Sequence, residues 1–179
     1  IVSQAGCETF IVHARKAWLQ GLSPKQNREV PPLIYEYVHR LKKEKPQLEI
    51  IINGGIKTLD VAREQLQHVD GVMIGREAYH NPYMLAEVDK TIYKDEEAEV
   101  VSRQEVVERL CEYIDEQLSD EVDLHSITRH ILGLYTGCRG ARLWRRYLSE
   151  NSHRKGADSS LVREALKFVE PVDETPSGG

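Results

Sequence analysis

The chain has 179 residues, of which 40% are hydrophobic and 30% are charged, and its formal net charge at pH 7 is −5. This composition is typical of globular proteins, and the length allows one medium-sized domain, or one and a half small ones, with a hydrophobic core. No segment approaches 18 consecutive apolar residues, so we expect no membrane-spanning helix and no membrane partner. The chain begins with Ile1, which indicates a processed protein or a piece of a longer one.

The three cysteines, Cys7, Cys111 and Cys138, lie far apart and lack the spacing of a metal site. Reduced thiols in a reducing compartment are the simplest interpretation, so we expect a cytoplasmic protein without a metal. Cys7 precedes the first strand-like segment, and we interpret it as a buried thiol rather than a nucleophile.

The first half of the chain alternates between strand-like and helix-like segments. Its three short apolar runs lie at 10–12, 49–52 and 71–74. Such runs are typical of strands that are buried on both faces of a parallel sheet. Helical patterns at 33–41 and 59–66 separate them, and Thr58 is the predicted N-cap of the second helix. This order predicts repeated β/α units.

From about residue 100 the pattern becomes helical throughout. Amphipathic stripes occupy residues 106–118, 124–134, 143–148 and 161–169. Ser102 and Glu105 form a capping-box pattern before the first stripe. Four such helices predict a small bundle. We therefore predict a β/α part at 1–95, a helical domain at 100–170 and a disordered tail at 171–179.

Polar and glycine residues follow each of the three predicted strands. His13 ends the first strand, Asn53-Gly54-Gly55 ends the second, and Gly75-Arg76 ends the third. Glycine turns let backbone N–H groups approach an anion, and arginine adds charge-assisted donors. Because loops after consecutive late strands of a (β/α)8 barrel often bind phosphate, we predict a phosphate site here; ordinary tight turns are the alternative.

The segment 129–155 is strongly basic, with seven arginines and lysines against one acidic residue. Arg139, Arg142, Arg145 and Arg146 recur at spacings of three and four, which places them on one face if the segment is helical. Such a row can bind phosphates along a nucleic-acid backbone, although a solvated surface is the simpler alternative. Lys25 and Arg28, in an earlier loop, would extend this surface.

Several motifs together resemble one known family. They are His13–Lys25 (HARKAWLQGLSPK), Asn53–Ile56 (NGGI), Asp70–Pro82 (DGVMIGREAYHNP), Arg129–Tyr135 (RHILGLY) and Gly140–Arg146 (GARLWRR). In this order they resemble the tRNA-dihydrouridine synthases of the A type. The resemblance extends from residue 5 to about residue 150.

The resemblance implies an α/β plus all-α architecture. It corresponds to about strands six to eight of a (β/α)8 TIM barrel followed by a small helical bundle. The implied activity is FMN-dependent reduction of uridine to 5,6-dihydrouridine at positions 20 and 20a of the tRNA D-loop, with NADPH as reductant. The implied partner is tRNA rather than DNA, and the full-length form is expected to be a monomer.

The resemblance also assigns roles to individual residues. The FMN contacts of the family fall on His13, Asn53, Gly54, Gly55, Gly75 and Arg76. Arg15 matches a substrate-facing position, and the tRNA-binding positions fall on Lys25, Arg28, Arg142 and Arg145. The proton-donating cysteine of the family lies in the N-terminal half of the barrel, outside this chain. We therefore expect the chain alone to be inactive.

Two alternatives remain open at this point. The chain could serve as a non-catalytic tRNA-binding module, which the basic segment favours. Another FMN-dependent barrel oxidoreductase would share the phosphate loops but not the arginine row. Three parallel strands of a barrel would leave open edges and an exposed apolar face, so we expect the β/α part to need more chain around it.

Overall fold

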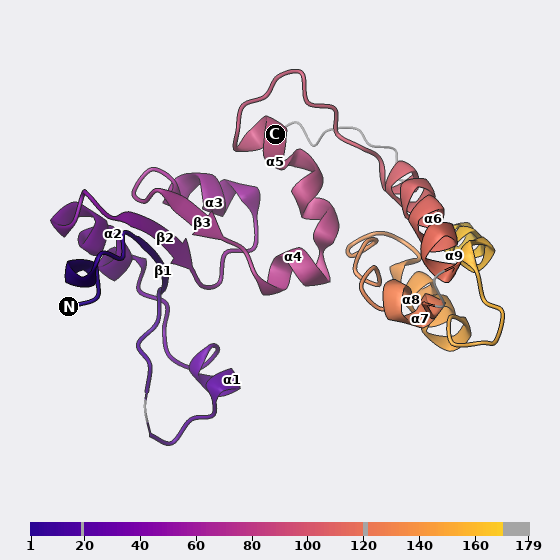
Figure 1. Ribbon diagram of the computed structural model, residues 1–179, viewed down its shortest axis with the longest axis horizontal. Helices are drawn as coiled ribbons and strands as arrows, with labels where there is room; N and C mark the ends of the chain where they lie inside the picture. Colours follow the sequence, from indigo (N-terminus) through magenta and orange to yellow (C-terminus); the bar gives the residue numbers. More distant parts are fainter. Residues whose placement is uncertain (19, 120–121, 170–179) are drawn as a thin grey trace. The chain divides into compact units, whose positions relative to one another are not determined.

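A computed structural model describes residues 1–18, 20–119 and 122–169, so the predicted tail at 171–179 lies outside the described residues. The chain divides into two compact units, Ile1–Glu77 and Ala78–Gly179, which are described separately (Figure 1). This division differs from the predicted boundary at 95–100. The reason is that Tyr83 packs against the helical core and Thr136 donates a hydrogen bond to the His80 carbonyl.

The first unit is built on a three-stranded parallel sheet in the order β1-β2-β3. Its strands are β1 (Thr9–His13), β2 (Glu49–Asn53) and β3 (Gly71–Met73), and its helical segments are η1 (Ser3–Ala5), α1 (Pro24–Asn27), α2 (Tyr35–Glu44) and α3 (Leu59–Gln65). The predicted strand–helix–strand–helix–strand order is thus confirmed. Thr58 caps α3 as predicted, since its hydroxyl accepts a hydrogen bond from the Val61 N–H at 3.2 Å.

The two faces of this sheet have different surroundings. Ile50 and Ile52 of β2 are fully buried on one face, in the same core as Val38 of α2 and Ala62 of α3. On the other face Ile11 of β1 is 53% exposed, so the prediction that each strand is buried on both faces is wrong. Within the described residues β1 and β3 also each pair on one side only, so the sheet has two open edges as well as an exposed face.

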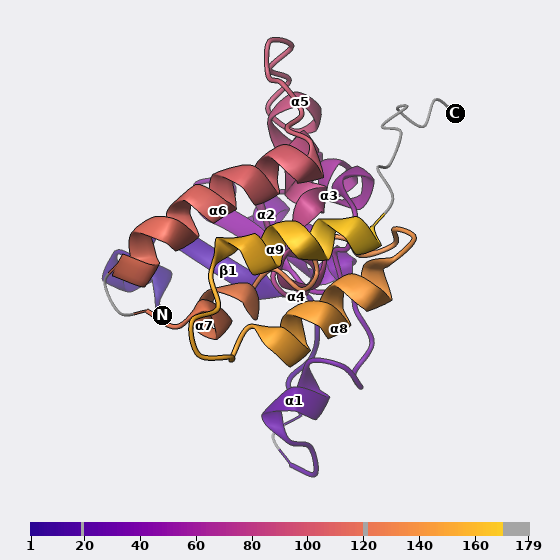
Figure 2. The ribbon, with the colours of Figure 1, turned by 90° about the vertical axis from the view of Figure 1, so that its right-hand side faces the viewer.

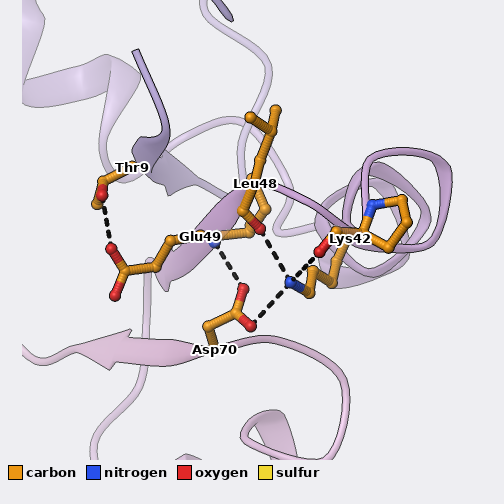
Figure 3. Close-up of polar contacts among 7 residues, drawn as sticks. Thr9, Lys42, Leu48, Glu49 and Asp70 are labelled. Carbon is orange, nitrogen blue, oxygen red and sulfur yellow. Dashed lines mark hydrogen bonds and ion pairs between the residues drawn. The ribbon is translucent and has the colours of Figure 1, made fainter. Parts of the chain in front are cut away.

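A polar network connects α2 with the amino ends of β2 and β3 (Figure 3). The Lys42 ammonium lies 2.8 Å from an Asp70 carboxylate oxygen and also donates to the Leu48 carbonyl at 2.9 Å. The other oxygen of Asp70 accepts a hydrogen bond from the Ile50 N–H at 2.8 Å. The bond from Ile50 and the contact with Lys42 lower the pKa of Asp70. Cys7, predicted to be buried, is only partly buried near the same end of the sheet.

The second unit is helical (Figure 2). Its segments are α4 (Arg76–His80), which begins at the end of the first unit, η2 (Pro82–Glu87), α5 (Val88–Thr91), α6 (Arg103–Ser119), α7 (Leu124–Thr128), α8 (Ala141–Asn151), α9 (Ser159–Ala165) and η3 (Leu166–Phe168). Helix α9 packs against both α6 and α8. The core contains the fully buried residues Val107, Ile114, Trp144, Leu148 and Val162. The predicted helical character of this part of the chain is therefore confirmed.

The segment between α7 and α8 differs from the prediction. The stripe at 124–134 was expected to be helical throughout, but α7 ends at Thr128 and turns follow. One reason is the close approach of Gly133 to the His80 carbonyl, where an added Cβ would lie 2.3 Å from the oxygen. Arg139 lies in the turn before α8, so it is not part of the helical arginine row as predicted. No helix of the described residues is long and apolar enough to span a membrane.

Candidate functional site

The carboxyl ends of the strands bring together most of the residues predicted to bind phosphate. His13 of β1 is in register with Asn53 of β2, which is in register with Met73 of β3. Gly54 and Gly55 follow β2 with φ angles of +125° and +68°. The Tyr35 hydroxyl donates a hydrogen bond to the Gly54 carbonyl at 2.8 Å and holds this turn against α2.

The two glycines after β2 are required for a reason that the sequence pattern did not predict. A Cβ on Gly54 would lie 2.8 Å from Nδ1 of His13, and one on Gly55 would lie 2.4 Å from a Leu33 methyl carbon. The turn therefore packs directly against side chains of its own unit. At Gly75 an added Cβ would meet no described heavy atom within 4 Å, so this backbone is open to a bound group.

The positive charges of three arginines act on the imidazole of His13. Partial burial lowers the pKa of His13, and the positive charges of Arg15, Arg28 and Arg76 lower it further. Glu29 is a counter-ion that the sequence pattern did not reveal. Its carboxylate Oε1 lies 2.7 Å from Nη1 of Arg76 and forms an ion pair with it. Because the arginine charges outnumber this acid, the strand ends form an electropositive region suited to an anion.

Arg15 supplies the clearest sign of a missing ligand. Its backbone pairs with Leu33, and its Nη1 donates a hydrogen bond to the Pro31 carbonyl. Its Nε is buried and has no hydrogen-bond partner within the described part of the chain. A buried donor without a partner is costly, and an acceptor from a bound group would satisfy it. The predicted phosphate-site residues therefore fit an anionic group such as the phosphate of FMN.

The predicted tRNA-binding residues belong to both units. Lys25 of α1 and Arg28 belong to the first unit, where Arg28 lies near His13. Arg142 and Arg145 are exposed on α8, while Trp144 and Leu148 on its other side are buried. Neither Arg142 nor Arg145 has an acidic partner among residues 1–18, 20–119 and 122–169, whereas the neighbouring Arg146 pairs with Glu150 at 3.5 Å. Their charge is therefore available to a polyanion.

Metal ligands do not gather in the described part of the chain. No group of three or more His, Cys, Asp or Glu side chains there is arranged to hold a metal ion.

Comparisons with known proteins agree with these features. The family model described as dihydrouridine synthase (Dus) matches residues 1–170. Proteins named tRNA-dihydrouridine(20/20a) synthase are similar: that of Yersinia pestis is 54% identical over 179 residues, covering 100% of this chain and 52% of the relative. That of Pasteurella multocida (strain Pm70) is 54% identical over 94% of this chain and 51% of its own length. That of Escherichia coli (strain K12) is 56% identical over 91% of this chain and 47% of its own length. The chain spans about half the length of these curated relatives.

Proposed function

The chain belongs to the dihydrouridine synthase family, and from this premise we propose that it is the C-terminal part of an FMN-dependent tRNA-dihydrouridine synthase. The complete enzyme would reduce uridine to 5,6-dihydrouridine at positions 20 and 20a of the D-loop with NADPH, as a cytoplasmic monomer. The first unit would hold the phosphate end of the flavin, and the second would bind tRNA. No residue of this chain is proposed as the proton donor.

The phosphate end of FMN is assigned to the carboxyl ends of β1, β2 and β3. Arg76 would pair with the phosphate, the open backbone at Gly75 would approach it, and His13 would donate from its ring. The turn Asn53-Gly54-Gly55 keeps His13 in place through the close packing at Gly54. The flavin, when bound, supplies the hydride for the C5–C6 bond of uridine. The positive charges that Arg15, Arg28 and Arg76 exert on His13, together with the open backbone at Gly75, are the observation that carries the proposal.

The substrate would reach the flavin as a base turned out of its stack. A stacked uridine cannot present its C5–C6 bond to another ring, so the enzyme must extract it. Arg15, beside His13, is proposed to face this base, and Lys25 and Arg28 are proposed to contact the tRNA nearby. Arg142 and Arg145 of α8 are proposed to bind tRNA phosphates, because both are exposed and free of acidic partners in the described residues.

A comparison of FMN with riboflavin tests the phosphate assignment. The two ligands differ only by the phosphate, so a chimera in which this chain replaces the matching half of the Yersinia pestis relative should bind FMN more tightly when titrated by flavin fluorescence. Arg76→Ala should abolish that preference. Arg63→Ala is the matched control, because Arg63 is an exposed arginine of the same unit that pairs with Asp60 at 2.9 Å. Equal binding of the two flavins by the unaltered chimera, or a retained preference in Arg76→Ala, would contradict the assignment.

A chimera tests the activity. This chain would replace the matching half of the Yersinia pestis relative, and dihydrouridine in a tRNA transcript would be measured by mass spectrometry. We expect dihydrouridine at positions 20 and 20a, and a loss of tRNA affinity in Arg142→Ala and Arg145→Ala with unchanged flavin content. A folded, flavin-containing chimera that leaves uridine unreduced would refute the proposed function.

A further inference from the structure

A basic groove in the second unit lies outside the residues assigned above. It has a volume of about 750 Å3 and is formed by the end of α6, by α7 and by the segment that joins α8 to α9. The charged and titratable residues that line it are Asp123, His125, Arg129, His153, Arg154, Lys155 and Asp158. Leu118 and Val122 contribute an apolar wall. The groove is large enough for a nucleotide-sized group.

The positive charges of this groove are less compensated than the negative ones. Arg154 and Lys155 are exposed and have no ion pair within the described residues. Asp158, by contrast, is engaged at the start of α9, where it accepts hydrogen bonds from the Ser160 N–H at 3.0 Å and from the Ser160 hydroxyl at 2.5 Å. Asp123 is thus the one lining carboxylate named above that is not engaged in a helix cap. It faces the positive charges of Arg129, Arg154 and Lys155, so the groove favours an anion.

Arg129 is held in place by its neighbours. Its Nε donates a hydrogen bond to Nε2 of His130 at 3.0 Å, and Nδ1 of His130 lies 3.0 Å from the Tyr79 hydroxyl. A guanidinium group cannot accept, so Nε2 is the acceptor and the ring proton of the neutral imidazole is on Nδ1, which donates to Tyr79. This chain of bonds restricts the guanidinium and leaves its terminal N–H groups available to a ligand in the groove.

We propose that this groove binds a phosphate of the RNA backbone through Arg129, Arg154 and Lys155. His130 and Tyr79 act as positioning residues for Arg129. The proposal rests on the proposed function, because it assumes that the second unit binds tRNA. The groove begins at Ser152, ten residues after Arg142, or about 15 Å along the axis of α8. The groove would therefore contact a different phosphate of the same tRNA from those bound by Arg142 and Arg145.

Salt-dependent binding of the full chain to an unmodified tRNA transcript tests this proposal. Each phosphate contact adds about 0.9 to the slope of log affinity against log salt for a duplex. We expect Arg129→Ala to lower the slope by about 1 and the double variant Arg154→Ala/Lys155→Ala to lower it by about 2. Arg109→Ala is the control, because Arg109 is an exposed arginine of the same unit that pairs with Glu105 at 2.6 Å.

The positioning role has its own readout. His130→Ala removes the acceptor for Arg129 but no permanent charge, so it should weaken binding about two- to tenfold, the loss of one hydrogen bond, without lowering the salt slope. His130→Gln keeps an acceptor and a donor and should restore the affinity. Equal weakening by both variants would overturn the positioning role, since a merely structural defect would not be rescued by glutamine.

The remaining outcomes separate this proposal from the proposed function. If Arg142→Ala and Arg145→Ala weaken tRNA binding but the groove variants do not, the groove assignment is wrong and the proposed function stands. If the unaltered chain does not bind tRNA, both are wrong. Adenosine monophosphate serves as the competing probe. Arg129-dependent binding of this nucleotide that leaves tRNA binding unchanged would assign the groove to a free nucleotide and overturn the RNA proposal.

Discussion

The two units of this chain bury their apolar residues in different ways. The helical unit encloses a core in which Trp144, Ile114 and Leu148 are fully buried. The sheet unit buries Ile50 and Ile52 on one face, yet Ile11 on the other face is 53% exposed and Met73 is 37% exposed. A helix satisfies its backbone within itself, whereas a parallel strand needs a neighbour on each side. Within the described residues the helical unit therefore has no open strand edge, whereas the sheet unit presents two open edges and an exposed apolar face.

This contrast agrees with membership of a barrel family in which the chain spans about half the length of its relatives. The exposed face carries His13 and Asn53 at its carboxyl end. Ile11 and Ile51 precede them by two residues on the same strands and so lie on the same face. The same face therefore bears both the proposed flavin contacts and the uncovered apolar side chains. The chain that would cover this face would therefore also complete the proposed flavin site.

The two tryptophans offer the strongest test of the contrast. Trp144 is fully buried against Tyr135, with ring centroids 4.8 Å apart, whereas Trp18 is 47% exposed. We expect Trp144→Ala to lower the free energy of unfolding of the helical unit by about 3–5 kcal/mol. Trp18→Ala should change the free energy of unfolding of the sheet unit by less than about 0.5 kcal/mol. Urea unfolding followed by circular dichroism measures both, and similar losses would contradict the difference in packing.

Two isoleucines on opposite faces of the sheet sharpen the comparison within the first unit. Ile50→Ala should cost about 2–4 kcal/mol, because it opens a cavity in the buried face. Ile11→Ala should cost less than about 0.5 kcal/mol, since Ile11 is already 53% exposed to water. A large loss for Ile11→Ala would mean that the exposed face is covered in solution, for example by a second copy of the chain. Sedimentation velocity of the unaltered chain distinguishes that case.

Acidification should weaken the sheet unit through Asp70. Its hydrogen bond from Ile50 and its contact with Lys42 hold the pKa of the carboxyl below the unfolded value of about 3.9. The carboxylate therefore stabilises the unit above that value, and this contribution is lost as the pH falls through the folded pKa. Asp70→Asn should lower stability at pH 7 by about 1–2 kcal/mol, a value reduced for partial exposure, and flatten the acid dependence. An unchanged acid profile would refute this role.

The smallest effects are expected for exposed ion pairs, one in each unit. Arg63→Ala breaks the pair with Asp60, and Arg109→Ala breaks the pair with Glu105. Each should change stability by no more than about 0.5 kcal/mol, because exposed charges are well solvated. Thermal unfolding of both variants measures this directly. A larger loss would disqualify them as controls in the binding experiments.

The sequence predicted the strand ends better than it predicted their surroundings. His13, Asn53 and the glycines after β2 were placed at one edge because parallel strands end together. Tyr35, Leu33 and Glu29 were missed, since contacts between a loop and a distant turn leave no periodic signal. Pro31-Pro32 followed by an apolar residue was the one hint that this segment closes over the turn.

The amino-acid sequence by itself determined the order of the elements, the caps at Thr58 and Ser102, and the positions of the charged residues. These depend on local periodicity and on side-chain bonds to nearby backbone, as the 3.1 Å bond from the Glu105 N–H to the Ser102 hydroxyl illustrates. Tertiary structure decided the exposure of Ile11, the early end of α7, the unit boundary after Glu77 and the contact of Tyr79 with His130. Each of these features depends on which segments, distant in the sequence, pack against each other. The burial of a residue is set by those neighbouring segments and not by the residue type alone.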